Sequence, residues 1–438
     1  MRIWAKVFGL LVTMGAIAAV SWLNFLPGPT ATPASNLPEK VSSEALPLSV
    51  FCPGPLVEMG GTDGTDLGTL DLAGSANLEF FSSGTLEQIP DSKLEIGSVL
   101  RLTSTEQTTS ALAANQWQSI SRPRMAGLSA LNCDQPSAEG WFLNGTAGVG
   151  KESILLLANP NEVEVQINLE FHLPGEVNAE QVTLAPGAQA QFSLAPFVDA
   201  ESAFAVRYST NGPAVSAALQ NRFSSGLSAT GVELVAPMTA LTGEALIPGI
   251  NIEPSSFEQP KLRLMNLSSD TSEIRMVFHG IGNDSDVMAV TLEPGELREL
   301  DLQLAPGEYL LEAKSDGEFL LAIRSSELAV RLDFAWLLPM DTFMGGLTLP
   351  LPDPEGTLVI ANPSSNRISV SVEMQGQYQS FSIAGFSEVA IPALGPVARV
   401  QSAKSFGAAL ILSNDQGFSV VMPRENLNLG SNLEVFVD

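Results

Sequence analysis

The segment SILLLANPNEVEVQINLEFHLPG (residues 153–175) contains two apolar runs separated by the polar sequence Asn-Pro-Asn-Glu. Its second run alternates apolar and polar residues, and the apolar ones are Val163, Val165, Ile167, Leu169 and Phe171. A period of two places these side chains on one face of a β-strand. Asn159-Pro160 is typical of a turn, because Asn side chains bond to nearby backbone and Pro fixes φ. The segment therefore predicts a β-hairpin.

The hairpin pattern recurs along the chain. It is found again at residues 260–282, with Asn266 at the turn, and at 355–377, with Asn362 there. Each copy is followed by two further pairs of runs, at 182–194 and 203–219, at 290–302 and 308–324, and at 381–393 and 397–412. Residues 98–116 resemble residues 202–220, which indicates a fourth, degenerate copy ahead of the other three.

Many short strands with turns about every 8–12 residues are typical of a two-sheet β-sandwich. We therefore predict an all-β fold of about four tandem immunoglobulin-like β-sandwich domains after one N-terminal transmembrane helix. The expected parts are a cytoplasmic N-terminus (1–6), a transmembrane signal anchor (7–26), a Pro/Ser/Thr/Ala-rich spacer (27–46), a degenerate sandwich with a disulfide (47–140) and three further sandwiches (141–240, 241–340 and 341–438). Short links predict a stiff rod, and a β-propeller is the alternative.

The N-terminus predicts a membrane anchor. Arg2 and Lys6 precede an apolar run from Val7 to Leu26, and about 20 helical residues cross a hydrocarbon core about 30 Å thick. Because both positive charges precede the run, we expect a cytoplasmic N-terminus and an extracellular body at the cell membrane. Cleavage of a signal peptide, followed by secretion, is the alternative.

The sequence contains two cysteines, Cys52 and Cys133, both in the part expected to be exported. An even pair in an oxidising compartment predicts a disulfide. A loop of about 80 residues gives roughly 4 kcal/mol of stabilisation in the chain-entropy model. The bridge would join the opening strand and the closing end of the most divergent repeat.

The two histidines invite a catalytic interpretation, but the repeats argue against it. His172 lies thirteen residues after Asn159, and His279 lies thirteen after Asn266. The third copy has Gln375 at the corresponding position. Two imidazoles at equivalent places in different domains do not share one site. We therefore expect them to be polar residues that close a strand at a turn.

Other candidate motifs are incomplete. GTAGVGKES (145–153) nearly matches a phosphate-binding loop, but Glu152 replaces the required hydroxyl residue and a predicted strand follows directly. Two acidic loops could suit calcium, and they contain Asp63, Asp66 and Asp71, and Asn283, Asp284 and Asp286. Neither loop has a complete ligand pattern, so we predict no metal site and no cofactor. Glycosylation sequons begin at Asn144, Asn266 and Asn283.

The composition excludes several functions. The chain has 48 Asp and Glu against 21 Lys and Arg, a formal charge of −27, so nucleic acid is not an expected partner. The sequence contains no G-x-S-x-G elbow, and two distant histidines do not form a hydrolase triad. The aromatic content of 7% disfavours a sugar-stacking groove, although Trp117, Trp141 and Trp336 lie in the expected body.

The residues Cys52-Pro53-Gly54-Pro55, Cys133, Trp141 and Asn159-Pro160 together resemble an uncharacterised actinobacterial family of exported, membrane-anchored cell-envelope proteins. The resemblance implies an envelope location, often beside membrane glycosyltransferases, and no established activity. It supplies no catalytic residues.

These observations favour a non-enzymatic, membrane-tethered envelope protein that acts as a spacer, scaffold or binding partner. The expected partner is an envelope protein, such as a membrane glycosyltransferase, or a glycan. Two alternatives remain: an accessory carbohydrate-binding module for envelope polysaccharide assembly, which a groove lined by tryptophans would favour, and a calcium-dependent adhesin with acidic loops.

Overall fold

A computed structural model describes residues 39–41, 49–60, 66–82, 85–89, 100–103, 112–198, 203–253, 258–282, 284–328, 332–352, 355–424 and 433–435. These residues form antiparallel β-structure and one short 3₁₀ helix, Ala195–Phe197, and none of their helices could cross a membrane. The expected anchor at 7–26 lies outside them.

Contacts divide the chain into two units. One joins residues 1–45 to residues 429–438, and in it β1 (Glu39–Val41) pairs with β32 (Leu433–Val435). The other unit, residues 46–428, is called the body below and contains four repeats.

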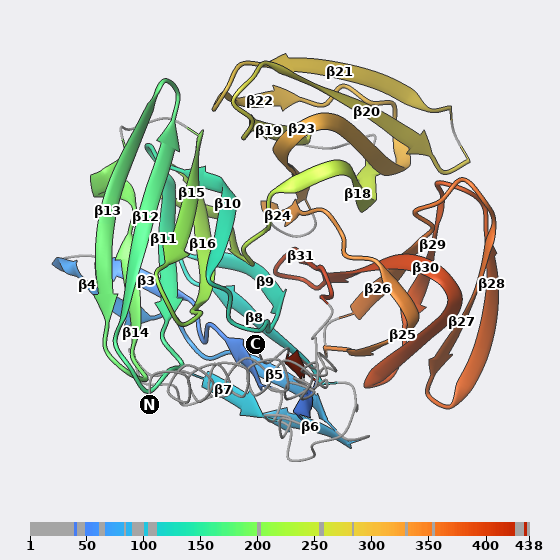
Figure 1. The fold of residues 1–438 in the computed structure, drawn as a ribbon, viewed down its shortest axis with the longest axis horizontal. Helices are drawn as coiled ribbons and strands as arrows, with labels where there is room; N and C mark the ends of the chain where they lie inside the picture. The colour runs from blue at the N-terminus through green and yellow to red at the C-terminus, as the bar shows by residue number, and fades with distance from the viewer. Residues whose placement is uncertain are drawn as a thin grey trace, which may run out of the picture. The chain divides into compact units, whose positions relative to one another are not determined.

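Repeat 2 consists of two four-stranded antiparallel sheets, with strand orders β10-β15-β12-β13 and β14-β11-β16-β17 (Figure 1). The strands are β10 (Glu139–Thr146), β11 (Lys151–Ala158), β12 (Val165–Leu173), β13 (Glu176–Leu184), β14 (Gln189–Ser193), β15 (Ala203–Thr210), β16 (Ser216–Ser225) and β17 (Ser228–Val235). The alternating residues of β12, from Val165 to Leu173, point into the core between the sheets.

Repeats 3 and 4 have the same plan, except that one long strand runs through both sheets. β23 pairs with β18 and β20 in one half and with β19 and β24 in the other, and β30 does the same with β25, β27, β26 and β31. Repeat 3 contains β18 (Leu241–Ile252), β19 (Lys261–Asn266), β20 (Ser272–Gly280), β21 (Asp286–Leu292), β22 (Leu297–Asp301), β23 (Gly307–Leu328) and β24 (Leu332–Leu337). Repeat 4 contains β25 (Phe343–Pro350), β26 (Glu355–Ala361), β27 (Ile368–Met374), β28 (Gln377–Ile383), β29 (Glu388–Ala393), β30 (Val397–Ser413) and β31 (Phe418–Val421).

Repeat 1 is a reduced version of this plan. Its strands are β2 (Ser49–Cys52), β3 (Val57–Gly60), β4 (Asp66–Leu72), β5 (Asn77–Ser82), β6 (Thr85–Ile89), β7 (Leu100–Thr103), β8 (Ala113–Ser121) and β9 (Ala126–Asn132). β7 pairs with β2 as β15 pairs with β10, and β8 pairs with β5 and β9 as β16 pairs with β11 and β17. The sequence alignment of 98–116 with 202–220 therefore matches equivalent strands.

The predicted hairpins are wrong. β11 and β12, the two runs of the opening segment, belong to different sheets and do not pair. The same is true of β13 and β14, and of β15 and β16. The hairpin is instead β12–β13, which pairs Leu173 with Glu176. The Asn-Pro turn thus carries the chain from one sheet to the other, a connection that strand-turn-strand patterning does not distinguish from a hairpin.

In each of repeats 2, 3 and 4, a buried asparagine stabilises the crossing that follows the first run by hydrogen bonds to the backbone. Asn159 is fully buried, and its Nδ2 donates to the carbonyls of Val163, Leu184 and Ala185 while its Oδ1 accepts from the Asn161 amide. It therefore joins the β11–β12 crossing to the β13–β14 crossing. Asn266 and Asn362 are also fully buried and make the corresponding bonds in repeats 3 and 4.

The four repeats pack against one another in a closed cycle, so the expectation of a rod is wrong. Apolar clusters join neighbouring repeats, and each includes residues of both: Leu131 with Leu234, Met238 with Leu320, Ile247 with Val359, and Ala130 with Val421. The last pair joins repeat 1 to repeat 4. The short links would allow an extended chain, but burial of apolar surface between the repeats gives the packed arrangement the lower free energy.

Candidate functional site

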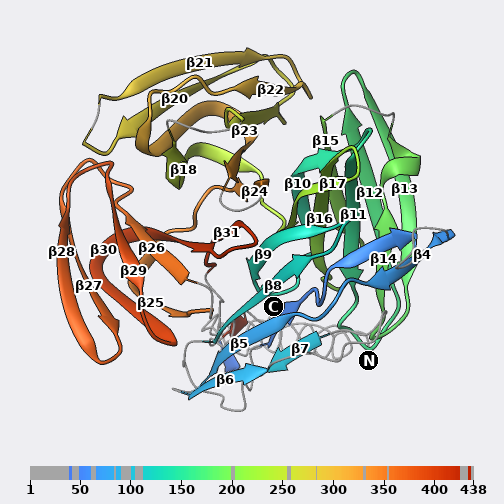
Figure 2. The same ribbon diagram turned by 180° about the vertical axis from the view of Figure 1, so that it is seen from behind.

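The last strand of each repeat lies in the same region of the body. These strands are β9, β17, β24 and β31, and they contact one another. Figure 1 shows β9, β24 and β31 near the middle of the body, and Figure 2 labels all four strands. Their sequences align as Gly127-Leu128-Ser129, Gly231-Val232-Glu233, Asp333-Phe334-Ala335 and Gly417-Phe418-Ser419. Three repeats thus have glycine where repeat 3 has an aspartate.

The carboxylate of Asp333 fills the space that the three glycines leave. A Cβ atom at Gly127 or Gly231 would lie 2.7 Å from its Oδ1, and one at Gly417 would lie 1.8 Å from its Oδ2. The three glycines have φ angles of 151°, 139° and 159°, which other residues rarely adopt. Backbone conformation and space therefore both require glycine there.

Backbone amides from repeats 1 and 4 donate hydrogen bonds to Asp333. Its Oδ2 accepts hydrogen bonds from the amides of Leu128 (2.9 Å) and Phe418 (3.2 Å). The amides of Val232 and Phe334 oppose the increase in the pKa of this carboxyl, although Oδ1 makes no hydrogen bond within the described part of the chain. Converging N–H groups are an anion-binding arrangement, and the anion here is a side chain of the protein itself.

Glu233 lies in the same centre, two residues after Gly231, and is 2% exposed. Its carboxyl oxygens contact the hydroxyls of Ser129 (3.2 Å) and Ser419 (2.9 and 3.0 Å), and Oε1 accepts from the Leu234 amide (3.0 Å). A hydroxyl can donate or accept, so these partners suit a protonated carboxyl as well as an ionised one. The amides around Asp333 can only donate.

Burial raises the pKa of both carboxyl groups well above the usual range. The charge of Asp333 raises the pKa of Glu233 further, whereas the amides oppose the increase in the pKa of Asp333. The charge of Asp333 thus disfavours ionisation of Glu233, because it would place a second buried charge beside the first.

This centre has no room for a substrate. Asp333 is fully buried, and the cavity beside Glu233 has a volume of about 20 Å³, enough for one water molecule. Ser129, Glu233 and Ser419 come from repeats 1, 2 and 4, and Asp333 comes from repeat 3. The arrangement therefore brings polar side chains of all four repeats into one buried centre.

The histidines end strands, as the repeat comparison predicted. His172 is near the end of β12, where its ring lies 5.0 Å from that of Trp141, and burial lowers the pKa of its imidazole. His279 is near the end of β20, where Nε2 lies 2.6 Å from Glu312 Oε2 and the ring stacks on Phe386 of repeat 4. The structure does not bring the two histidines into one site.

The remaining motifs also have structural explanations. GTAGVGKES spans the end of β10, the turn at 147–150 and the start of β11, so a strand and not a helix follows Gly150. The acidic positions Asp284 and Asp286 are exposed, and the described residues contain no group of three or more potential metal ligands. Asp63, Asn283 and the side chain of Asp66 lie outside the description, and Asp71 lies in β4.

Two of the sequon asparagines are buried. Asn144 is 1% exposed and its Nδ2 donates to Asn221 Oδ1, while Asn266 is the fully buried asparagine of repeat 3. Neither amide can carry a glycan in the folded body. The tryptophans do not form a groove either, because Trp141 and Trp336 belong to one buried cluster and half-buried Trp117 donates to Glu79.

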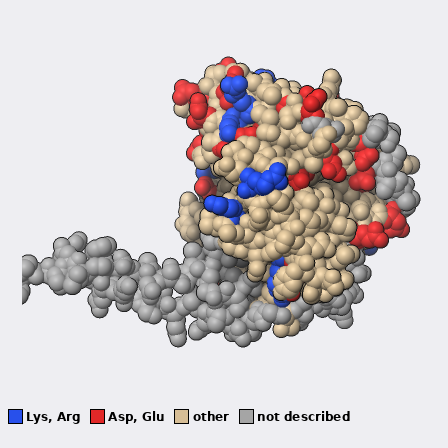
Figure 3. Space-filling model, turned by 90° about the vertical axis from the view of Figure 1, so that its right-hand side faces the viewer, with Lys and Arg blue, Asp and Glu red and all other residues tan. Residues whose placement is uncertain are grey.

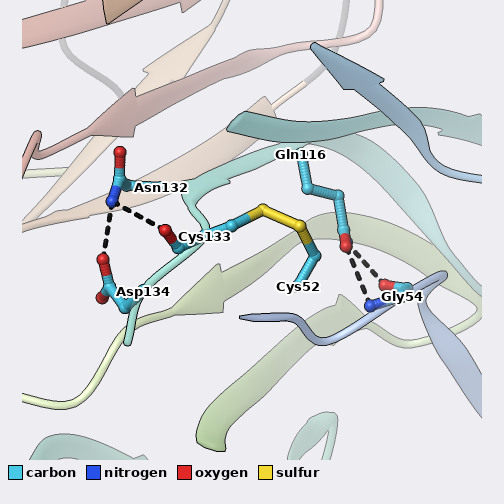
Figure 4. Close-up of a disulfide and its surroundings, with 6 residues drawn as sticks. All are labelled: Cys52, Gly54, Gln116, Asn132, Cys133 and Asp134. Carbon is cyan, nitrogen blue, oxygen red and sulfur yellow. Dashed lines mark hydrogen bonds between the residues drawn. A yellow bond between two sulfur atoms is a disulfide. The ribbon is translucent and has the colours of Figure 1, made fainter. Parts of the chain in front are cut away.

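Cys52 and Cys133 form a disulfide, with a Cα–Cα distance of 4.6 Å (Figure 4). It connects β2 to the residue that follows β9. The Cys-Pro-Gly-Pro segment after Cys52 makes no strand pairing of its own. The Gln116 side chain instead accepts from the Gly54 amide (2.8 Å) and donates to its carbonyl (2.5 Å), as Figure 4 shows.

Two shallow, open grooves lie on the sheets of repeats 3 and 4. The first has a volume of about 840 Å³, and its ionisable lining residues are Glu244, Asp270, Glu273, Arg275, Lys314 and Asp316. The second has a volume of about 470 Å³ and is lined by Gly345, Ser369, Val370, Ser371, Ser380, Gln401, Ser402 and Ala403. Sequence reasoning found neither groove.

The central carboxylates were also missed, although the sequence carries a signal for them. Gly127, Gly231 and Gly417 are each followed by an apolar residue and then by serine or glutamate, at the same place in their repeats. Asp333 interrupts that series. A glycine series interrupted by one acid could have indicated a shared centre.

Fold and site define an all-β protein whose repeats are fastened together by buried polar groups. Residues 90–374 match the family of unknown function DUF5719, and the chain belongs to that family. No curated protein matches the sequence.

Three solved structures with some similarity can be named. One concerns host cell surface retention of a bacterial ice-binding adhesin, with 8% identity, coverage of 66% of this chain and 97% of that chain, and a TM-score of 0.11. A Ca²⁺-stabilised adhesin of an Antarctic bacterium has 9% identity, coverage of 81% and 91%, and a TM-score of 0.12. The FN1-FN3 domains of chicken CNTN1 have 10% identity, coverage of 63% and 96%, and a TM-score of 0.11. TM-scores this low carry no conclusion about function.

Proposed function

We propose that this protein is a non-enzymatic, membrane-tethered component of the cell envelope. Its N-terminal helix would hold it in the membrane with the body outside, and the body would act as a scaffold that binds an envelope partner. We also propose that its repeats are immunoglobulin-like sandwiches.

The observation that carries this proposal is the burial of the converging carboxylates. An enzyme that uses two acids needs them beside a cleft that admits substrate. Glu233 and Asp333 are instead buried and hydrogen-bonded to other repeats. A scaffold benefits from such fastening, because it fixes the relative positions of its binding faces.

Crosslinking on intact cells tests the scaffold role. The full chain is crosslinked at the cell surface, purified and analysed for co-purifying envelope proteins, with a variant at an exposed position, Arg367→Gln, as the matched control. Recovery of the same membrane protein, such as a glycosyltransferase, with both chains supports the proposal. Hydrolase or transferase activity that Glu233→Gln abolishes while the fold is retained would contradict it.

A second candidate is the accessory carbohydrate-binding role. The uncharged groove of repeat 4 favours it, whereas the buried Trp141 and Trp336 do not.

A further inference from the structure

We propose that the groove of repeat 4 binds an uncharged oligosaccharide. The inference deepens the proposed binding role, and it rests on that role for the extracellular location of the groove.

The lining of the groove has the chemistry for such a ligand. Its polar side chains are hydroxyls and one amide, and it has no ionisable residue. Ser402 Oγ is occupied, because it donates to the Ser369 carbonyl and accepts from the Lys404 amide. The hydroxyls of Ser371 and Ser380 and the amide of Gln401 make no side-chain hydrogen bond within the described part of the chain, so they can bond to sugar hydroxyls.

The net charge of the protein further limits the class of ligand that this groove can bind. At a formal charge of −27 the chain repels anionic polymers, and a lining without carboxylates does not attract cations. Figure 3 faces the side of the body on which β27 and β28 lie in Figure 1, and it shows a broad area free of charged side chains. A neutral, hydroxyl-rich ligand fits this surface best.

An aromatic side chain stands beside the groove. Tyr378 is 73% exposed and precedes Ser380 by two residues in β28, so both project from the same face of the strand. An exposed aromatic ring can pack against the apolar face of a sugar ring. Tyr378 thus supplies the stacking surface that the buried tryptophans do not.

The backbone keeps the groove open. The register of β25 against β30 shifts between Phe343 and Gly345, and Gly345 has a φ of 90° with open space where a Cβ would be. β-Bulges of this kind bend a strand and often lie next to functional sites. Repeat 3 has the same shift before Gly243, so its groove is built on the same backbone.

Repeat 3 provides the matched control. Ser371 pairs with Gln401 in repeat 4, and Arg275 pairs with Lys314 at the corresponding place in repeat 3. The double variant Ser371→Arg/Gln401→Lys therefore gives repeat 4 the two side chains that repeat 3 carries at the same backbone positions. The reverse variant, Arg275→Ser/Lys314→Gln, changes the groove that the proposal does not use.

The test is native affinity electrophoresis of the full chain in mild detergent. The gels contain dextran, mannan, the neutral polysaccharide fraction of the source cell envelope, or anionic alginate. We expect a neutral polymer to retard the chain and alginate to have no effect. Ser371→Arg/Gln401→Lys and Tyr378→Ala should each weaken retardation at least tenfold without lowering the melting temperature, and Arg275→Ser/Lys314→Gln should not weaken it.

No retardation by any neutral polymer would overturn the inference, and so would full retardation of Ser371→Arg/Gln401→Lys. Either result would leave the scaffold role standing if crosslinking still recovers a protein partner. If crosslinking recovers no partner but a neutral polymer still retards the chain, the scaffold role would be refuted and oligosaccharide binding by the groove would be supported.

Discussion

Replacing Asp333 by alanine should destabilise the body strongly, because it removes the acceptor shared by buried amides of repeats 1 and 4. The substitution leaves the amides of Leu128 and Phe418 buried without their partner at 2.9 and 3.2 Å. A buried N–H group without a partner costs about 1–3 kcal/mol. Two such groups cost roughly 2–6 kcal/mol, and removal of a desolvated carboxyl from the interior offsets part of this cost. We expect a net loss of about 3 kcal/mol.

Urea unfolding of the full chain, followed by tryptophan fluorescence, measures this loss. Trp336 lies three residues after Asp333 and is 3% exposed, so its emission reports on the centre. Asp333→Asn is the matched control, because its amide oxygen can still accept from the same N–H groups, and we expect it to lose less than about 2 kcal/mol. Two results would refute the assignment of Asp333 as the shared acceptor. One is a loss below about 1 kcal/mol for Asp333→Ala, and the other is a loss for Asp333→Asn that exceeds the loss for Asp333→Ala.

Three further substitutions test other parts of the account. Asn362→Ala should lower the free energy of unfolding by about 3 kcal/mol, because three carbonyls lose their donor, and an unchanged urea midpoint would contradict this. Cys52→Ser should cost roughly 4 kcal/mol by the chain-entropy model, measured against the wild type under oxidising conditions, and equal stability of the two would be inconsistent with the disulfide. Burial raises the pKa of Glu388, which accepts from the Gly249 amide of repeat 3, to about 8. A carboxyl with a raised folded-state pKa stabilises the fold below its unfolded pKa and loses that contribution as pH rises, so the wild type should lose up to about 3 kcal/mol more than Glu388→Gln between pH 5 and pH 7. Parallel pH profiles for the two proteins would exclude this role for Glu388.

The sequence predicted those features that depend on local pattern. Alternation in the segment that ends at Phe171 identified β12, and the spacing of His172 and His279 from their asparagines identified equivalent strand ends. The turn at Asn159 was located correctly, but its role was not, because a crossing between sheets and a hairpin have the same sequence pattern. The full burial of Asn159 decides between them, and burial is a tertiary property.

The cycle of repeats could not be predicted from the sequence, because it depends on contacts between residues far apart in the chain. Ser419 bonds to the Ala130 amide, and the two are 289 positions apart. Links between repeats do not encode such packing, because the free energy comes from apolar faces that pair only in the assembled body. The grooves escaped prediction for the same reason, since Ser371 and Gln401 are ordinary exposed residues until β27 and β30 are paired.

A thiol crosslink between repeat 4 and repeat 1 would show whether the cycle of repeats is closed. Asn414 Nδ2 donates to Ser119 Oγ at 3.3 Å, although 295 positions separate these residues. The native cysteines are both in the disulfide, so Ser119→Cys/Asn414→Cys introduces the two free thiols. We predict rapid intramolecular oxidation of this pair at low protein concentration, seen as a mobility shift on non-reducing gels. Free thiols that react only between molecules would show that the repeats form an open array and would contradict the closed cycle.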